Sequence, residues 1–196
     1  MSRADGLATT DAERACLSAL REATGAVDDP MERHTVRQFL IAERLAADRS
    51  LDADGELLLC ATFLHDAGLF PGVTTGDVYI ADSRRLAERT LAPFNWEPAR
   101  LARCLDAIEQ HHSRHSRWDW GTEVELVRRA DLVDVSRGLV RFGLDRSWLR
   151  NLFREIPRRG FYRLIAAALL REGIRDPGNL PRIFTPPPEP TEPPAS

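Results

Sequence analysis

Apolar residues recur at helical spacing along nearly the whole chain, and no segment shows the alternation that marks a half-buried β-strand. In residues 31–47, for example, Phe39 and Leu40 follow Val36 by three and four positions and so share one helix face. A chain with this pattern cannot form a sheet-based core. We therefore predict an all-α fold.

Start and stop signals divide the pattern into a bundle of about seven to eight helices. Gly68, followed by Pro71 and Gly72, ends one of them. The segment after Phe184 is rich in proline and almost without apolar residues, so we expect an extended, disordered tail. The expected helices cover about 10–25, 31–47, 54–66, 77–91, 95–112, 122–137, 147–156 and 160–172.

Length and charge favour one compact domain. The chain has 196 residues and a formal net charge of −3, which argues against a general nucleic-acid or membrane-surface binder. The apolar stretch of residues 57–64 is too short to span a membrane, and the first residues of the chain lack a signal-peptide core. We expect a cytoplasmic protein with an N-terminal helical extension (1–30), a main domain (31–182) and a tail (183–196).

Cysteine and lysine usage exclude several kinds of chemistry. Cys16, Cys60 and Cys104 form no CxxC pair, so neither a disulfide scaffold nor a thiolate zinc site is indicated. All 27 residues counted as Lys or Arg are arginines. Schiff-base catalysis and a phosphate-binding-loop lysine are therefore excluded, and any chemistry depends on His, Asp, Glu or Arg.

The dipeptide His65–Asp66 closes the apolar run LLLCATFLHD. Burying an acid beside an imidazole is costly unless a partner or metal neutralises the pair. A helical hairpin would bring His34, near the start of the preceding helix, to the same place. Asp131 has small and apolar neighbours in RRADLVDVSR, which indicates an inward-facing position. Two imidazoles and two carboxylates suit Mn²⁺, Fe²⁺, Zn²⁺ or a similar ion.

Several of these positions have alternatives. His34 taken alone reads as a partly exposed residue at a helix start. Asp134 faces the same way as Asp131 and is either a supporting partner or a surface charge. His111 and His112 differ by about 100° on a helix, so both can hardly point at one centre, and we choose His111 as the nearer. His115 lies in a polar stretch and reads as a surface residue.

Other residues allow two interpretations each. Arg37, one turn after His34, would either clamp an anionic substrate or form a structural ion pair. Trp118 and Trp120 would either roof the pocket or pack in the core. The apolar helix GFYRLIAAALL implies deep burial or a subunit contact. Four arginines recur at every fourth residue: Arg146, Arg150, Arg154 and Arg158. We interpret this stripe first as the solvated face of a helix and second as a surface that attracts phosphate-bearing ligands.

The segments HTVRQFLIAERLAAD, LLLCATFLHDAG, IEQHH and RRADLVDVS together resemble the HD-domain metal-dependent phosphohydrolase superfamily. The resemblance covers about residues 31–137 and implies one HD-type helical bundle that binds one divalent ion, whether Mn, Fe, Zn, Co or Ni. It implies that His111 or His112 lies beside the ion as a substrate contact or added ligand. The ligands that it implies are His34, His65, Asp66 and Asp131.

The sequence lacks motifs that mark particular branches of this superfamily, which reduces the number of branches that it resembles. HDAGLFPGV lacks the Glu-Asp pair of the alarmone hydrolases, and the chain has no GYP element of the cyclic-dinucleotide enzymes. Residues 67–110 contain no histidine, which disfavours a two-metal site, although His111, His112 and Asp82 would supply a reduced one. HTVRQFLIAERLA, HDAGLF and AIEQHH are also similar to segments of cyanamide hydratase-like HD proteins.

The function that this resemblance implies is hydrolysis of a small phosphorylated metabolite or nucleotide by metal-activated water. Asp66 would ligate the ion and orient the water, and His111 would protonate the leaving group. Arg37 would hold the phosphate, with His112 as a second substrate contact. The alternatives are a cyanamide hydratase-like hydratase and a non-catalytic sensor. We expect a small-molecule substrate and neither nucleic acid nor membrane as partner, and we leave a homodimer open.

Overall fold

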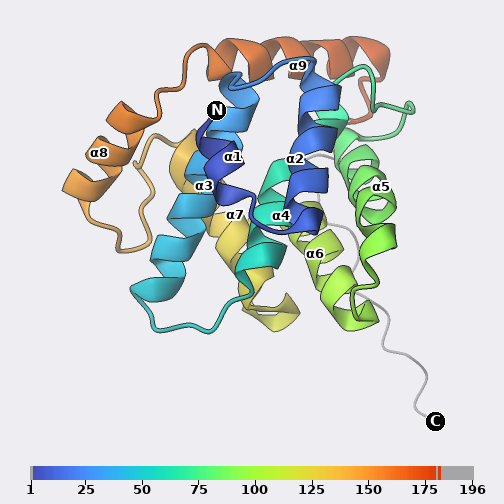
Figure 1. Ribbon diagram of the computed structural model, residues 1–196. Coiled ribbons are helices and arrows are strands. Elements are labelled where there is room, and N and C mark those ends of the chain that lie inside the picture. The colour runs from blue at the N-terminus through green and yellow to red at the C-terminus, as the bar shows by residue number, and fades with distance from the viewer. Residues whose placement is uncertain (1, 180, 182–196) are drawn as a thin grey trace.

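The structure is a computed structural model that describes residues 2–179 and 181, and across this part of the chain it contains helices and no strand (Figure 1). The all-α prediction is confirmed. Eight long helices correspond to the predicted ones: α2 (Asp11–Thr24), α3 (Pro30–Ala47), α4 (Gly55–Leu64), α5 (Tyr79–Leu91), α6 (Pro98–Gln110), α7 (Thr122–Val135), α8 (Arg146–Glu155) and α9 (Phe161–Arg175). The proline-rich segment 183–196 lies outside the described residues.

One short helix, α1 (Arg3–Leu7), was not predicted. The Ser2 hydroxyl accepts a hydrogen bond from the Asp5 amide, and the Asp5 carboxylate accepts one from the Ser2 amide. Such a reciprocal pair stabilises a helix start. The helix has only five residues, too few to show an apolar period.

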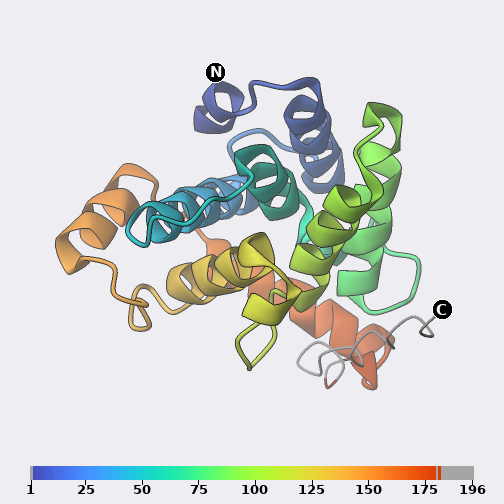
Figure 2. The same ribbon diagram turned by 90° about the horizontal axis from the view of Figure 1, so that it is seen from below.

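Helix α4 forms the centre of the bundle. All of its residues from Leu57 to Leu64 are buried, and it packs against α2, α3, α5, α6 and α7. A helix enclosed in this way is apolar on every side, which accounts for the run of apolar residues that only Thr62 interrupts. Figure 2 shows α3, α4 and α7 as close neighbours on one side of the bundle and α5 and α6 on the other.

Helices α4, α6 and α7 run opposite to α3, so the start of α3 and the ends of the other three helices meet near one end of the bundle (Figure 1). Helix α9 lies across this end. Deep burial, one of the two interpretations of its sequence, is wrong: Phe161, Ala168 and Glu172 alone are buried in α9, while Leu170 is 65% and Ile174 74% exposed.

Each described helix is too short or too polar to cross a lipid bilayer.

Candidate metal centre

His65 and Asp66 lie just past the end of α4, not within it. The amide of His65 donates to the Ala61 carbonyl as the last hydrogen bond of the helix, and Asp66 begins a 3₁₀ turn at Ala67–Leu69. Both side chains are buried, with His65 Nε2 3.3 Å from Asp66 Oδ2. The predicted burial of the pair is confirmed, while its helix ends two residues earlier than expected.

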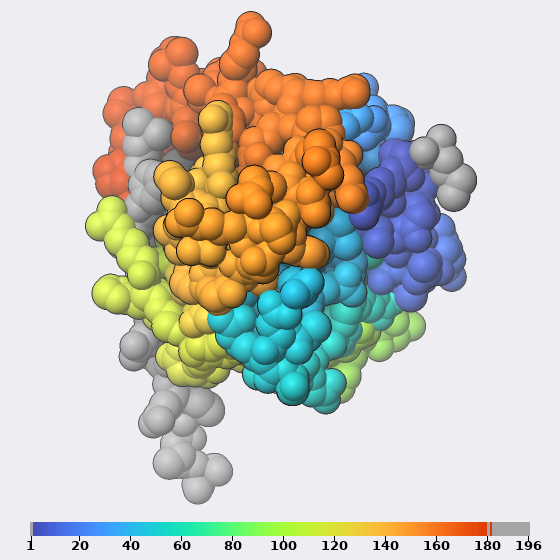
Figure 3. Space-filling view, turned by 90° about the vertical axis from the view of Figure 1, so that its left-hand side faces the viewer, coloured from blue at the N-terminus to red at the C-terminus, as the bar shows by residue number. Residues whose placement is uncertain are grey.

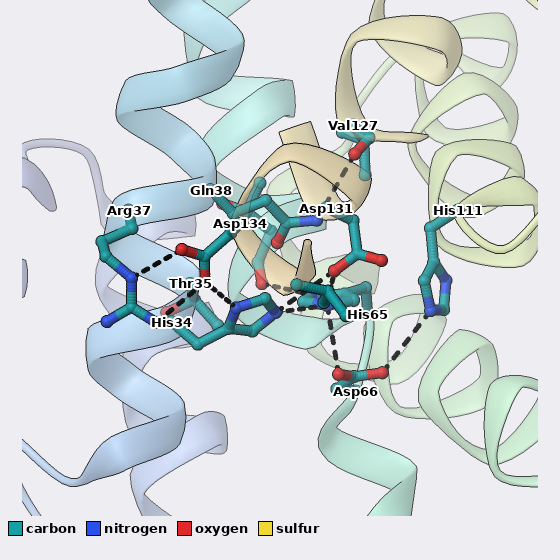
Figure 4. Close-up of polar contacts among 12 residues, drawn as sticks. His34, Thr35, Arg37, Gln38, His65, Asp66, His111, Val127, Asp131 and Asp134 are labelled. Carbon is teal, nitrogen blue, oxygen red and sulfur yellow. Dashed lines mark hydrogen bonds and ion pairs between the residues drawn. The ribbon is translucent and has the colours of Figure 1, made fainter. Parts of the chain in front are cut away.

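The other two predicted ligand residues lie beside this pair (Figure 4). His34, from the second turn of α3, places its Nε2 atom 3.3 Å from His65 Nε2. Asp131 of α7 places Oδ1 3.4 Å from His34 Nε2 and 3.9 Å from His65 Nε2. Side chains from α3, from the end of α4 and from α7 therefore converge, and the hairpin argument predicted this approach for His34 and His65.

Each of three histidines directs its Nδ1 atom to an oxygen acceptor. A neutral imidazole that donates through Nδ1 keeps a lone pair on Nε2, and this second contact is typical of histidines that bind metals. All three Nε2 atoms lie next to Asp66 or to another member of the cluster. The Nδ1 atom lies 2.7 Å from Asp134 Oδ2 in His34, 2.8 Å from the Thr62 carbonyl in His65, and 2.6 Å from the Ile108 carbonyl in His111.

The spacing of the donor atoms fits a divalent cation. Two imidazole nitrogens bound to one ion at 2.0–2.1 Å lie about 3.3 Å apart at the tetrahedral angle, and His34 Nε2 and His65 Nε2 are 3.3 Å apart. In addition, Asp66 Oδ1 is buried and accepts no hydrogen bond within the described residues. A buried carboxylate oxygen without a donor is costly unless a cation neutralises it. The nitrogen and oxygen donor set suits Mn, Fe, Zn, Co or Ni.

The electrostatics of the cluster also favour a cation. Burial lowers the pKa of His34, but hydrogen bonds and charges from Asp131 and Asp134 outweigh it and raise this pKa to about 9. Burial raises the pKa of Asp66, yet His65 and His111 together hold it well below its usual range. The carboxylates therefore stay ionised at neutral pH, and their combined field attracts positive charge.

His111 and His112 both approach the cluster, so the expectation that both can hardly point at one centre is wrong. His111 Nε2 is 3.5 Å from Asp66 Oδ1, and His112 Nδ1 is 3.9 Å from Asp131 Oδ2. The expected angular separation holds only inside a helix, and α6 ends at Gln110. Asp66, His111 and His112 form a second group of potential ligands, whose donor atoms lie within 4.8 Å of one another.

Tyr79 is a member of the site that the sequence gave no reason to single out. Its hydroxyl lies 2.6 Å from His112 Nε2 and 3.4 Å from His111 Nε2, and the side chain is buried. Burial and the nearby charges of Asp66 and Asp131 raise the pKa of Tyr79 well above its usual value. An aromatic residue in the first turn of a helix is most often a core residue, so no motif distinguished it.

Asp134 and Arg37 form a buried ion pair behind His34 (Figure 4). Asp134 is fully buried, so its reading as a surface charge is wrong. Arg37 donates from Nε and Nη2 to the two Asp134 oxygens, both at 2.8 Å, and from Nη1 to the Ile156 carbonyl at 3.3 Å. The guanidinium group thus lies on the far side of Asp134 from Asp66. This geometry favours the structural ion pair over the substrate clamp.

The remaining predicted residues lie apart from the histidines. Asp82 accepts hydrogen bonds from Thr74 and Thr75 and pairs with Arg85. Its carboxylate therefore holds the loop before α5 and does not join the reduced two-metal set.

The stretch between α6 and α7 is partly exposed to solvent. His115 is an exposed loop residue, as predicted. The indole rings of Trp118 and Trp120 lie beside the guanidinium groups of Arg129 and Arg117, at 4.9 and 5.8 Å. These contacts give no support to the idea that the two tryptophans roof the pocket.

The arrangement of these residues agrees with one comparison to known proteins. The model of the HD domain matches residues 31–136, which is more than half of the chain and contains every member of the cluster. No curated protein matches the chain.

Proposed function

The chain belongs to the HD domain family, and from that premise we propose that it hydrolyses a small phosphorylated metabolite or a nucleotide. Proteins of this family are mostly metal-dependent hydrolases. The observation that carries the proposal is the convergence of three histidine Nε2 atoms on the buried carboxylates of Asp66 and Asp131, where the Oδ1 atom of Asp66 accepts no hydrogen bond.

In this proposal one divalent ion, Mn, Fe, Zn, Co or Ni, is held by four side chains. Both imidazoles offer Nε2 because their Nδ1 atoms bind other acceptors. Both carboxylates offer an oxygen within 3.4 Å of an imidazole nitrogen. The proposed ligands are His34, His65, Asp66 and Asp131.

The ion would act as a Lewis acid that polarises a phosphoryl oxygen and lowers the pKa of a water molecule. Asp66 would bind the ion through one carboxylate oxygen and accept a hydrogen bond from the attacking water through the other, and so orient it. In its protonated form, His111 would donate the Nε2 proton to the leaving oxygen and keep the Nδ1 hydrogen on the Ile108 carbonyl. His112, whose pKa is lowered to about 4 by burial and by the His111 charge, would contact the substrate as a neutral group.

Arg37 has a different role in this proposal from the one expected of it. Its guanidinium group holds Asp134, and Asp134 holds the His34 ring. Arg37 is therefore a positioning residue that acts on the metal ligand through a carboxylate, and it does not bind the phosphate.

The test compares wild-type protein with His65→Ala and Asp66→Ala, and uses His115→Ala as the matched control in the exposed loop. Elemental analysis measures bound metal, and a panel of phosphomonoesters and nucleotides with added Mn²⁺, Co²⁺ or Ni²⁺ measures turnover. We expect the first two variants to lose metal and activity together, and the control to keep both. Full metal content and full turnover in either site variant would contradict the ligand set.

The same panel separates the competing functions. Bound metal with no hydrolysis of any phosphoester, together with hydration of a small nitrile, would overturn the phosphohydrolase proposal in favour of a hydratase. Bound metal with neither activity would indicate a sensor.

A further inference from the structure

A pocket of about 240 Å³ lies between the segment that follows α7 and one face of α8, on the side of the molecule that faces the viewer in Figure 3. It shares no residue with the candidate metal centre. Helix α8 also lies beyond the residues matched by the HD domain. The pocket is lined by Arg137, Gly138, Leu139, Arg141, Arg146, Leu149, Arg150 and Phe153.

Half of this lining is arginine, and none of it is acidic. Within the described part of the chain, none of the four guanidinium groups forms an ion pair with a carboxylate. The neighbouring acid, Asp145, accepts hydrogen bonds from the Trp148 amide and the Ser147 hydroxyl as the cap of α8. No carboxylate lines the pocket, although Asp145 is close enough to interact electrostatically with Arg150, and the pocket therefore carries a net positive charge.

The spacing of the arginine stripe accounts for part of this arrangement. Arg146 and Arg150 are four residues apart on α8 and so project from one face of the helix. Arg158, in contrast, lies beyond the end of α8 and donates to Asp134, and Arg154 is exposed but does not line the pocket. Two members of the stripe thus face the pocket, and the connection after α7 adds two more arginines to the opposite wall.

The pocket also has an apolar floor, which a merely solvated charged surface would lack. Leu139, which is 87% exposed, and Leu149, which is buried, both line it. Gly138, at φ +74°, lets the chain after α7 approach α8 closely, because a Cβ atom there would lie 3.1 Å from Leu149 Cδ1. This close approach brings Arg137 and Arg141 to the same hollow as Arg146 and Arg150.

Grouping four like charges is unfavourable unless an anion joins them. Guanidinium groups bind phosphate oxygens through paired hydrogen bonds, and Arg is weakly hydrated, so it gives up water at low cost. The volume is below the roughly 300–1,000 Å³ of pockets that enclose a whole drug-sized ligand, so it suits a compact polyanion or one end of a larger molecule.

We propose that this arginine pocket is a binding site for a diphosphate group, separate from the metal centre. The diphosphate would lie between the guanidinium groups of α8 and those of the connection after α7. Its source is either free inorganic diphosphate or the diphosphate of a nucleotide, in which case Leu139 and Phe153 contact the apolar part.

The experiment titrates the full-length protein calorimetrically with inorganic diphosphate and, separately, with ADP. EDTA is present throughout, so that any binding is independent of a bound metal ion. The pocket variant is the double substitution Arg146→Gln and Arg150→Gln. The matched control is Arg154→Gln and Arg163→Gln, which removes the same charge from exposed positions outside the pocket.

We expect wild-type protein to bind one diphosphate, and the pocket variant to bind it at least about tenfold more weakly, because each lost contact is a charge-assisted hydrogen bond. The control should stay within about twofold of wild type. Tighter binding of ADP than of diphosphate identifies the nucleotide as the source, and equal binding identifies the free anion.

Two results would overturn the proposal. One is the absence of saturable binding to wild-type protein. The other is equal weakening in the pocket variant and in the control, which would show only diffuse attraction to surface charge. If the pocket variant does not fold, amide chemical shifts of wild-type protein decide: diphosphate must perturb Gly138 and Leu139, and perturbation confined to the histidine cluster contradicts the proposal.

Discussion

Asp134 Oδ2 lies 2.7 Å from His34 Nδ1, although 100 residues separate the two in the chain. Burial raises the pKa of Asp134, but hydrogen bonds from His34 and Arg37 outweigh it and hold this pKa far below its usual value. The carboxylate is therefore ionised and accepts the Nδ1 hydrogen of His34, so that the Nε2 atom, whose proton a cation would displace, faces the cluster. Two arginines, Arg37 and Arg158, fix the carboxylate in turn.

This relationship predicts that Asp134→Asn weakens metal binding without removing any proposed ligand. Loss of the charged partner leaves the tautomer and orientation of the His34 ring less well fixed, and such changes typically cost about 10–100-fold in metal affinity. Competition with a chelator measures the affinity. Asp119→Asn, in an exposed turn, is the control. An unchanged affinity in Asp134→Asn would mean that Asp134 serves only as a counterion for Arg37.

Arg37→Leu separates the positioning role from the substrate clamp. The substitution leaves a buried carboxylate short of a partner, so we expect the free energy of unfolding to fall by about 3–5 kcal/mol. Urea denaturation measures this change, and Arg14→Leu, whose salt bridge is exposed, should change stability by about 1 kcal/mol or less. A clamp would behave differently: stability would stay near that of wild type while KM for the phosphorylated substrate rose.

Much of the fold could be predicted from the sequence because it follows from helical geometry, whereas the choice of the four proposed ligands depends also on the resemblance to the HD-domain superfamily. Residues 57–64 carry an apolar pattern that only a central helix satisfies, and the helix before it must return antiparallel. A hairpin then brings His34 to His65. Asp131 could be anticipated because its neighbours are small and apolar, which indicates an inward-facing position.

The partners of these residues could not be predicted in the same way. Whether Arg37 points toward the substrate or toward Asp134 depends on the depth at which α3 and α7 pack, and spacing along one helix carries no such information. The orientation of His112 depended on α6 ending at Gln110, and helix ends are the least reliable part of a sequence prediction. Tyr79 reaches the site because the backbone at Gly68 lies against the backbone at the start of α5, and no sequence pattern indicates this contact.

That close approach predicts the effect of Gly68→Ala. A Cβ atom at position 68 would lie 2.0 Å from the Tyr79 carbonyl oxygen and 2.8 Å from the Ser83 amide nitrogen. Both are backbone atoms of α5, so the start of that helix must move. We expect a loss of at least about 1–3 kcal/mol in unfolding free energy, which is typical of overpacked interiors. Gly72→Ala, where a Cβ atom meets nothing within 4 Å, is the control, and equal stability of the two variants would contradict this prediction.

The buried carboxylate of Glu125, in the first turn of α7, determines in part how the stability of the protein depends on pH. Its side chain is fully buried and accepts hydrogen bonds from Arg128, Arg129 and the Arg117 amide. Burial raises its pKa, but the bonds from Arg128 and Arg129 outweigh this and lower it from 4.5 to about 2. Because the folded-state pKa lies below the unfolded one, the unfolded chain binds more protons between these values.

The stabilisation from Glu125 is therefore complete above about pH 4.5 and is lost as the pH falls toward 2. A shift of this size corresponds to about 3 kcal/mol at neutral pH. Urea denaturation measures this contribution when wild-type protein and Glu125→Gln are compared at several pH values between about 6 and about 2.5. We expect the difference in stability between the two proteins to shrink steadily with acid, whereas the exposed Glu88→Gln control should differ little from wild type throughout. A difference for Glu125→Gln that stayed constant across the window would show that its charge does not contribute to folding.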